Sequence, residues 1–488
     1  MEQTSEPTEM KRELGLLDAT LLVAGSMIGS GIFIVAADIT RNVGSAGWLI
    51  AVWLITGVMT LIAAISYGEL SAMFPKAGGQ YVYLKEAYNP FVGFLYGWSF
   101  FTVIQTGTIA AVGVAFSKFT AYLIPAVSED LIFTSIKLNP VFDYTLTISH
   151  AQLLSIAVII LLTYINTRGI KSGKIIQTTF TLTKLVSLFG LIAFGFIMLK
   201  PDIWTANWTN AWDMHSLGKD GSIQSYTTIA ALSAFTAAMV GSIFSSDAWN
   251  NVTFIAGEVK NPQRNIGLSL FFGTLIVTVI YILANLVYTG VLPLQEIASA
   301  DKDRVAVAAS SVIFGNVGTI VIALMIMVST FGCNNGLILA GARVYYSMAE
   351  DGLFFKKTAS LNKNSVPEFA LWMQCVVAAI LCLSGKYGNL LDMISFVVVI
   401  FYVLTIGGIF ILRYKQPNTP RPYKAFGYPI LPALYILMGI SFCVLLYMYK
   451  PEYTQPGLVI VLSGVPVYFL WRYFGDSRKV GKSESPKD

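Results

Sequence analysis

The stretch AGSMIGSGIF occupies residues 24–33, in the middle of the first long apolar run of the chain. Its glycines Gly25, Gly29 and Gly31 each lower helix propensity by about 1 kcal/mol relative to alanine. One interpretation is close packing, because Gly25 and Gly29 have the small-xxx-small spacing that lets a neighbouring helix approach. The other is an unwound segment whose free N–H groups bind an anion at the start of a half-helix. On this stretch alone both interpretations stay open.

The composition of the whole chain defines its class. Of 488 residues, 55% are hydrophobic and 12% are charged, whereas soluble domains carry about 25% charged residues. This excludes an ordinary soluble enzyme, a disordered protein and a nucleic-acid binder. The chain has two histidines, and its four cysteines all lie in apolar stretches. No metal site, cofactor or disulfide framework is therefore expected, and the chain is predicted to be a polytopic membrane protein in contact with the lipid bilayer.

Twelve apolar runs are long enough to cross a bilayer, whose core needs about 20 apolar residues per helix. They predict an all-α protein with membrane spans at residues 16–40, 48–74, 91–123, 150–167, 175–199, 226–259, 265–291, 305–349, 367–384, 388–412, 429–449 and 456–474. With a cytoplasmic N-terminus, 22 of the 32 Lys and Arg residues fall on the cytoplasmic side, nine on the outer side and one inside the membrane. Because Lys and Arg favour the cytoplasmic side, both termini are predicted to be cytoplasmic.

The sixth run, residues 226–259, holds a second interruption. A straight helix of this length would measure about 50 Å, which is too long for one span, and the polar stretch FSSDAWNN fills residues 244–251 near its middle. Polar residues in a span are costly unless they line a cavity or a break. The alternative is a polar face that neighbouring helices satisfy. Breaks five spans apart predict two five-helix halves of inverted topology with a binding site between them.

Three charged residues in or near the spans need an explanation. Lys184 is the one base inside a span, about 14 Å of helix beyond Ile175, and an ionisable residue at such depth usually has a function. Its ammonium can occupy the place of a bound cation. The alternative is a structural partner for the unpaired carbonyl groups of a broken helix. Glu69 and Glu258 lie near predicted span ends and are interpreted as ordinary interfacial charges.

These residues resemble the amino acid–polyamine–organocation superfamily, and within it the L-amino-acid transporter family of bacterial type. The signature of the superfamily lies in residues 25–33 of the first span. The other motifs keep the order and spacing of the family across spans 1 to 8. They are YGEL at residues 67–70, PKAGGQY at 75–81, TKL at 183–185, DAWN at 247–250, EVKNP at 258–262 and FGCNNG at 331–336.

The resemblance implies a LeuT-type fold, in which spans 1–5 and 6–10 form a 5+5 inverted repeat and two further helices are peripheral. The implied parts of the chain are a cytoplasmic N-terminal tail (1–13), a first five-helix repeat (14–199), an outer loop (200–225), a second five-helix repeat (226–412), spans 11–12 (413–475) and a cytoplasmic tail (476–488).

The resemblance also implies a substrate site between the broken first and sixth spans. Ser30 and Gly31 would donate backbone N–H groups to a substrate carboxylate, because the start of a helix carries positive partial charge. The carbonyl groups of Phe244, Ser245 and Asp247 would accept hydrogen bonds from the substrate ammonium, with the Phe244 ring as a gate. The other implied residues are Met27 and Ile28 as lining, Gly25, Gly29 and Ser246 at the helix breaks, and Lys184 as the fifth-span lysine held against the first span.

The function implied by the resemblance is sodium-independent transport of L-amino acids by alternating access, with exchange of neutral amino acids expected. Proton-coupled symport is an open alternative, and so is acceptance of cationic amino acids, because Asp247 is anionic. A membrane enzyme is the remote alternative, since it would need clustered catalytic groups whereas His150 and His215 are isolated. The loop at residues 124–149 has no cysteine, so no disulfide-linked heavy chain is expected. The expected location is the plasma or inner membrane.

Overall fold

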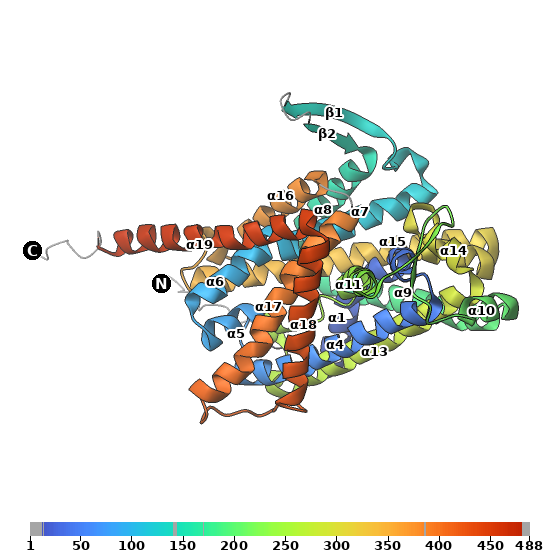
Figure 1. Ribbon diagram of the computed structural model, residues 1–488. Coiled ribbons are helices and arrows are strands. Elements are labelled where there is room, and N and C mark those ends of the chain that lie inside the picture. The colour runs from blue at the N-terminus through green and yellow to red at the C-terminus, as the bar shows by residue number, and fades with distance from the viewer. Residues whose placement is uncertain (1–11, 13, 140–143, 169, 385–386, 481–488) are drawn as a thin grey trace, which may run out of the picture.

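A computed structural model describes residues 12, 14–139, 144–168, 170–384 and 387–480 of the chain, which form a mostly helical body (Figure 1). Within this part of the chain, ten helices are long and apolar enough to cross a membrane, judged by length and composition. Two of the predicted spans fall below that measure. The first is divided at its break into shorter pieces, and the ninth forms a helix of 17 residues.

Nine of the predicted spans each lie on one helix. These helices are α4 (Ala46–Met73), α8 (His150–Thr167), α9 (Ile170–Ile197), α13 (Pro262–Val291), α15 (Val305–Glu350), α16 (Glu368–Ser384), α17 (Tyr387–Lys415), α18 (Ile430–Tyr449) and α19 (Pro451–Val480). The eighth predicted span, residues 305–349, is longer than the roughly 20 residues that one crossing needs. Its helix α15 turns at Gly315, whose φ of 67° and ψ of −168° are not helical. The predicted tail at 476–488 is helical through Val480, and its remainder lies outside the described residues, as do positions 1–11 and 13 of the N-terminal tail.

The other three spans are interrupted. The first consists of α1 (Leu16–Met27), α2 (Gly31–Ile34) and α3 (Ala36–Val43), and the sixth consists of α11 (Thr228–Ser245), α12 (Asn251–Phe254) and the 3₁₀ turn η3 (Ala256–Glu258). The third consists of α6 (Pro90–Ser99), the π-helical turn η1 (Phe100–Ile104) and α7 (Gln105–Leu123). The interruptions in the first and sixth spans occur at the glycine-rich and polar stretches, because these residues are poor helix formers.

The expectation of an all-α chain is wrong in the loops. A β-hairpin of β1 (Ile132–Asn139) and β2 (Tyr144–Ser149) projects from the helical body (Figure 1), because its residues are mainly β-branched or aromatic. A second antiparallel pair, β3 (His215–Leu217) and β4 (Ile223–Ser225), lies in the predicted outer loop. The remaining short elements are α5 (Gln80–Ala87), η2 (Pro125–Val127), α10 (Pro201–Trp208), α14 (Leu294–Ala298), η4 (Asp301–Asp303) and η5 (Lys356–Ala359).

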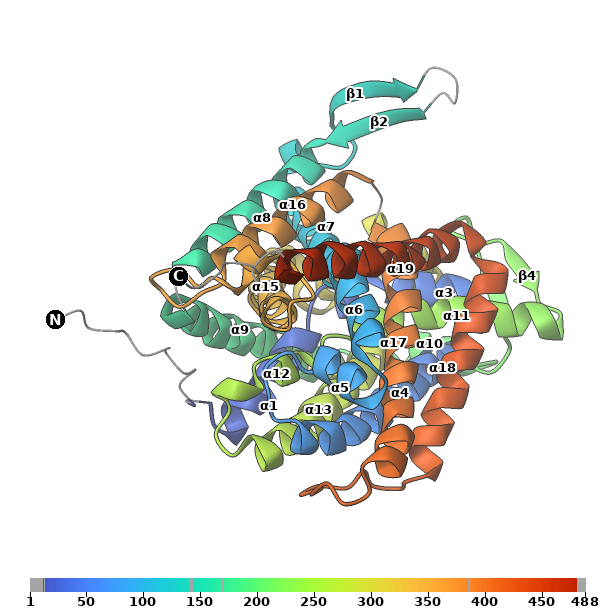
Figure 2. The ribbon, with the colours of Figure 1, turned by 90° about the vertical axis from the view of Figure 1, so that its left-hand side faces the viewer.

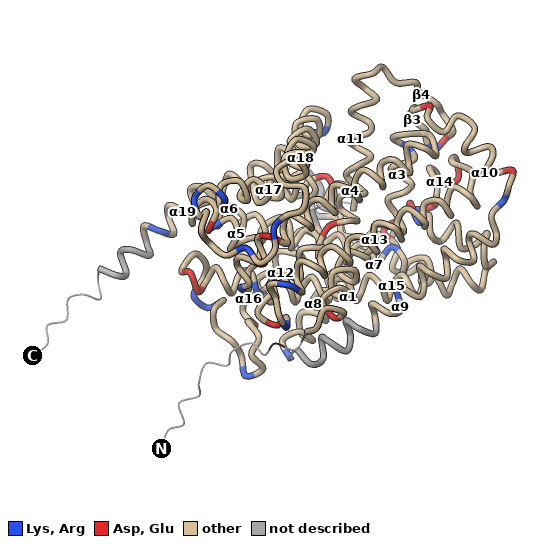
Figure 3. Tube along the Cα trace, turned by 90° about the horizontal axis from the view of Figure 1, so that it is seen from below, with Lys and Arg blue, Asp and Glu red and all other residues tan. Residues whose placement is uncertain are grey.

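The broken helices lie inside the bundle. α1 packs against α9 and α13, while α2 packs against α11 and α15. Figure 2 shows α12 next to α1 and α13, with α5 near them. Charged residues gather around the loops near both chain ends and around α10, α14, β3 and β4 (Figure 3). This arrangement places both helix breaks in the apolar interior, away from the charged loops.

The backbone just before α1 pairs with the backbone after η3. The N–H of Leu14 donates to the carbonyl of Glu258 at 3.0 Å, and the N–H of Lys260 donates to the carbonyl of Leu14 at 2.8 Å. Leu14 and Val259 thereby form a parallel bridge. The side chain of Glu258 accepts hydrogen bonds from Arg343 Nη2 at 2.7 Å and Nε at 3.0 Å. The segment around Glu258 therefore joins the start of α1 to α15.

Glu69 is not the interfacial charge that the sequence predicted. Its side chain is 1% exposed, at the end of α4, and its carboxylate accepts hydrogen bonds from Arg413 Nε at 3.0 Å and Nη2 at 2.7 Å. Arg421 Nε lies 3.3 Å from Oε1, and the backbone N–H of Ala425 donates to Oε2 at 2.8 Å. A buried carboxylate is tolerated here because two guanidinium groups and a backbone donor satisfy it.

Glu69→Ala is expected to lower the free energy of unfolding by about 3 kcal/mol, because two arginines lose their buried partner. The value is at the lower end for a broken buried pair, since Arg413 is 25% exposed and water partly solvates it. The thermal midpoint of the purified protein in detergent measures this loss. The exposed Glu296, for which the described residues offer no hydrogen-bond or ion-pair partner, gives the matched control Glu296→Ala. Equal midpoints for the two variants would contradict the prediction.

Candidate functional site

The first span changes direction between Met27 and Gly31. Ile28 leaves the helical region, with φ of −73° and ψ of 87°, and the N–H of Gly29 donates to the carbonyl of Met27 at 2.8 Å. Among the described residues, no backbone or side-chain acceptor contacts the N–H groups of Ser30 and Gly31. The second half of the span therefore begins with two free N–H groups, which can hold a carboxylate.

The second break follows Ser245, where α11 ends. Ser246 has φ of −92° and ψ of 5°, and Ala248 has a positive φ of 62°. The left-handed conformation costs a non-glycine residue roughly 1 kcal/mol, so surrounding contacts must hold Ala248 in place. The N–H of Asp247 donates to the carbonyl of Phe244 at 3.2 Å. The chain leaves the helix at the polar stretch and resumes a helical turn at Asn251.

The two breaks lie in direct contact. A Cβ atom placed on Gly31 would lie 1.9 Å from Oγ of Ser245, so only glycine fits at this point of α2. The Tyr281 hydroxyl, from α13, lies 3.0 Å from the carbonyl oxygens of both Met27 and Ser245. One tyrosine thus bridges the ends of both first half-helices. In this conformation the breaks leave no space for a ligand between Gly31 and Ser245.

Lys184 sits at the end of α1. It is fully buried in α9, and its Nζ donates to the carbonyl of Gly25 at 2.6 Å and to the carbonyl of Ile28 at 2.9 Å. On the other side, Sγ of Cys333 lies 3.5 Å from the carbonyl of Ser26. A cation at the C-terminal end of a helix is favourable, because the unpaired carbonyl groups carry negative partial charge. The lysine and the first helix break form one unit.

Aromatic rings cover the breaks on the side of Phe244. The Phe244 and Tyr387 rings lie edge to face with centroids 6.1 Å apart. The Tyr387 hydroxyl is 3.0 Å from Oγ of Ser30, and Nζ of Lys118 lies 5.5 Å from the centroid of the Tyr387 ring. Tyr387 begins α17, so this cover joins the first, sixth and tenth predicted spans. The Phe244 ring, predicted to be a gate, thus shares this cover with Tyr387.

A charged cluster lies beyond this cover. Arg41, at the end of α3, donates to Asp303 Oδ1 at 2.7 Å and to the carbonyl of Ala298 at 2.9 Å, and Lys219 lies 3.4 Å from Asp303. Burial raises the pKa of Asp303, but the charges of Arg41 and Lys219 outweigh burial and hold its pKa below the usual value. The cluster therefore stabilises the fold above the usual carboxyl pKa, and this contribution is lost as the pH falls through the lowered pKa.

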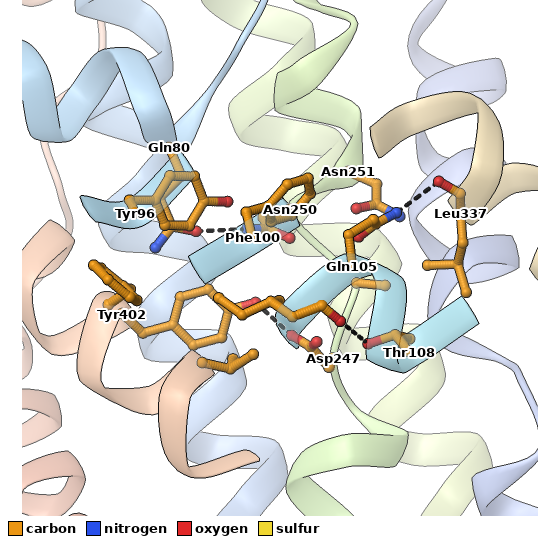
Figure 4. A pocket seen from close by; sticks show the side chains of 14 residues that line it. Gln80, Tyr96, Phe100, Gln105, Thr108, Asp247, Asn250, Asn251, Leu337 and Tyr402 are labelled. Atoms are coloured by element: carbon orange, nitrogen blue, oxygen red, sulfur yellow. Dashed lines mark hydrogen bonds between the residues drawn. The ribbon is translucent and has the colours of Figure 1, made fainter. Parts of the chain in front are cut away.

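A polar cavity lies on the other side of the second break (Figure 4). In this conformation it has room for about one water molecule. Asp247 lines this cavity, and no other predicted substrate-binding residue is among its described lining residues. The lining residues are Gln80, Tyr96, Phe100, Ile104, Gln105, Thr108, Asp247, Ala248, Asn250, Asn251, Leu337, Val398, Phe401 and Tyr402. The structure thus separates the predicted site into a closed contact at the breaks and a small polar cavity beside them.

Hydrogen bonds fix the polar lining. The Tyr402 hydroxyl donates to Oδ1 of Asp247, and no basic side chain in the described part of the chain forms an ion pair with Asp247. Gln80, at the start of α5, accepts from Nδ2 of Asn250 at 3.0 Å and donates to Oγ1 of Thr405 at 3.0 Å. Hydrogen bonds between amide and hydroxyl groups beside the cavity thus connect α5, the residue before α12, and α17.

Sequence reasoning missed several of these residues. Tyr281, Tyr387 and Tyr402 stand in apolar runs, where an aromatic residue carries no signal of its own. Gln105 had a signal, because an uncharged polar residue within a span usually has a buried partner. Among the described residues, no group of three His, Cys, Asp or Glu side chains could hold a metal ion.

Comparisons with known proteins agree with this architecture. The model of the amino acid permease family matches residues 14–470. The chain is 31% identical over 470 residues to the serine/threonine exchanger SteT of Bacillus subtilis (strain 168), an alignment that covers 95% of this chain and 98% of the relative. It is 28% identical over 468 residues to the large neutral amino acids transporter small subunit 2 of Mus musculus, with coverages of 95% and 82%. Identity to the b(0,+)-type amino acid transporter 1 of Homo sapiens is 27% over 495 residues, with coverages of 98% and 93%.

Proposed function

This chain belongs to the amino acid permease family, within the superfamily that its motifs resemble, and from that premise we propose that it is a sodium-independent exchanger of neutral L-amino acids. It works by alternating access in the plasma or inner membrane, and it holds its substrate between the two helix breaks. Relatives named as exchangers or transporters of serine and threonine or of large neutral amino acids support neutral substrates.

The position of Lys184 is the observation that carries this proposal. Its ammonium contacts two carbonyl oxygens at the end of α1, at 2.6 and 2.9 Å. A buried cation site made from the carbonyl groups of a broken helix is already filled by a side chain. A sodium ion would have to displace that ammonium, which would leave a buried charge without a partner. Transport therefore proceeds without sodium.

The substrate contacts use the free N–H groups of the first break and the carbonyl groups of the second. The N–H groups of Ser30 and Gly31 bind the carboxylate. The carbonyl groups of Phe244, Ser245 and Asp247 bind the ammonium at the C-terminal end of α11. Met27 and Ile28 line the site, and the Phe244 ring closes it. Because Gly31 and Ser245 touch in this conformation, binding requires these half-helices to separate, and that separation is part of the transport cycle.

The architecture proposed with this function is a twelve-span protein with both termini cytoplasmic. Residues 14–199 and 226–412 are the two inverted five-helix repeats, residues 200–225 form an outer loop, and residues 413–475 carry spans 11 and 12. Inverted repeats account for broken helices five spans apart. The loop at residues 124–149 offers no cysteine, so the protein works without a disulfide-linked heavy chain.

Two alternative functions would use the same site. Acceptance of cationic amino acids is favoured by Asp247, which faces the cavity and lacks a basic partner in the described part of the chain. Proton-coupled symport would need a buried group that gains and loses a proton during the cycle, and Lys184 is the first residue to examine for that role. Neither candidate changes the binding contacts proposed for the amino and carboxyl groups.

Uptake into proteoliposomes tests the proposal. Labelled alanine, leucine and arginine are each supplied with and without unlabelled amino acid inside, with and without an inward proton gradient, and with and without sodium. We expect uptake of neutral substrate that needs internal amino acid and ignores sodium. Uptake into empty vesicles driven by the proton gradient would instead indicate symport, and arginine uptake would widen the substrate class. No uptake of any amino acid above protein-free liposomes would overturn the proposed function.

A further inference from the structure

The third predicted span contains a π-helical turn next to the polar cavity. The turn η1 spans Phe100–Ile104, and the Thr106 hydroxyl donates to the carbonyl of Phe101, five residues back, at 2.8 Å. Phe100 and Ile104 both line the cavity, and Gln105 follows directly. A π turn inserts one extra residue into a helix, and such turns occur frequently at functional sites. The turn therefore sets which side chains of this span face the cavity.

The side-chain amide of Gln105 has a hydrogen-bond partner for its nitrogen but none for its oxygen among the described residues. Its side chain is 3% exposed, and its Nε2 donates to the carbonyl of Leu337 at 2.6 Å. A Cβ atom on Gly341 would lie 2.7 Å from Cγ of Gln105, so the missing side chain at Gly341 makes room for the glutamine. Within the described residues, Oε1 of Gln105 has no donor. An acceptor without a donor therefore lies on the cavity wall.

Asn251 supplies the complementary group. It begins α12, directly after the second break, it is 3% exposed, and it lines the same cavity (Figure 4). Its Nδ2 is buried and has no hydrogen-bond acceptor in the described part of the chain. A buried donor without an acceptor is unfavourable, and native structures nearly always satisfy such groups with protein, water or ligand. The side-chain amides of Gln105 and Asn251 on the cavity wall thus include an acceptor and a donor that the described part of the chain leaves unpaired.

We propose that Gln105 and Asn251 determine substrate specificity by selecting amino acids whose side chain carries a small hydroxyl or carboxamide group. This inference rests on the proposed function and names the substrate class. A hydroxyl can donate to Gln105 Oε1 and accept from Asn251 Nδ2, and a carboxamide can do the same with its two ends. An aliphatic side chain would leave both groups buried and unpaired, which is the condition under which sites reject apolar analogues strongly.

Two further features of the cavity restrict the class. It adjoins Asp247, whose carbonyl is the proposed contact of the substrate ammonium, so the side chain of a bound amino acid has a short path into it. In this conformation it has room for about one water molecule, and so small a volume favours small side chains. The Asp247 carboxylate already accepts a hydrogen bond from Tyr402, whereas Nδ2 of Asn251 has no acceptor in the described part of the chain.

Isosteric competitors test this inference. Exchange of labelled alanine in proteoliposomes is measured in the presence of unlabelled competitors. Threonine is compared with valine and asparagine with leucine, because the members of each pair match in shape but differ in hydrogen bonding. We expect the wild type to prefer the polar member of each pair at least tenfold. Gln105→Leu is expected to bring both ratios close to one, because it removes the acceptor while conserving most of the volume. Asn251→Leu removes the donor and is expected to act in the same direction.

Gln374→Leu is the matched control. Gln374 is also a buried glutamine, and its Nε2 donates to the carbonyl of Ile338 at 2.6 Å. Its Oε1 lies 2.6 Å from the position of a Cβ atom on Gly341. It does not line the cavity, so this variant is expected to keep the wild-type ratios. Equal ratios in Gln374→Leu and Gln105→Leu, or a wild type that transports alanine but prefers valine and leucine, would overturn the inference and leave the proposed function standing. If Gln105→Leu fails to fold, the wild-type ratios and Asn251→Leu decide. Absence of any amino acid exchange by the wild type would overturn the proposed function itself.

Discussion

Lys184→Ala is expected to reduce amino acid exchange roughly 100-fold while the protein stays folded. The change removes the ammonium that donates to Gly25 and Ile28 and leaves two buried carbonyl groups at the end of α1 without a donor. Loss of such a buried charged hydrogen-bond partner is worth about 3 kcal/mol, which corresponds to about two powers of ten in rate. Because the loss falls on the helix break, the position of the substrate-binding N–H groups changes with it.

The measurement is exchange of labelled alanine in proteoliposomes, with the elution profile and thermal midpoint in detergent as the test of folding. Ser187→Ala is the matched control, one turn further along α9. The Ser187 hydroxyl donates to the carbonyls of Thr183 and Lys184 in its own helix, at 2.9 and 3.0 Å, so its removal is expected to leave exchange within about twofold. Wild-type exchange by Lys184→Ala would show that the ammonium has no part in transport.

Gly31→Val is expected to abolish substrate binding, with a loss of roughly 100-fold or more. Atoms of Ser245 lie 1.9, 2.6 and 3.0 Å from the position of a Cβ atom on Gly31, and the last of these is its Cα. A side chain at this position must push α2 and α11 apart. In the separated conformation the isopropyl group covers the free N–H groups proposed to bind the carboxylate, and loss of such hydrogen bonds to a charged group is worth about 3 kcal/mol, or about two powers of ten in affinity.

Substrate-induced thermal stabilisation measures this loss directly, because a ligand that binds only the folded state raises the midpoint. Gly190→Val is the control, since no atom outside its own helix backbone lies within 4 Å of a Cβ placed at Gly190. This control is expected to keep wild-type binding. An equal shift of the midpoint by substrate in Gly31→Val would remove the carboxylate site from the start of α2.

Helical periodicity and apolar length predicted most of the fold, because both properties belong to short segments of the chain. The positions of nine helices and the interruptions near Gly29 and Ser246 could be predicted in this way. The hairpin of β1 and β2 was missed, because apolar length and helical periodicity carry no information on the strand propensity of a loop. Glu69 was misjudged, because its partner Arg413 is 344 residues away in sequence, and only the folded chain brings them together.

Some residues of the candidate site could be predicted from the sequence and others could not. The polar and glycine residues of the two breaks stand out in apolar surroundings, and so does Lys184. The hydroxyl groups of Tyr281, Tyr387 and Tyr402 do not, because their hydrogen-bond partners come from other helices. Contact between Gly31 and Ser245 could not be predicted either, since it depends on how closely two helices approach. The sequence therefore indicates which segments are interrupted, and the structure adds which groups connect them.

The backbone pairing of Leu14 with the segment around Val259 has a mechanical consequence. Two hydrogen bonds, of 3.0 and 2.8 Å, tie the entry of the first helix to the exit of the sixth, and Glu258 extends this tie to Arg343 in α15. If the start of α1 moves, the segment around Val259 must move with it or both hydrogen bonds must break. The two half-helices are thus linked to each other, and the ion pair of Glu258 with Arg343 links both of them to α15.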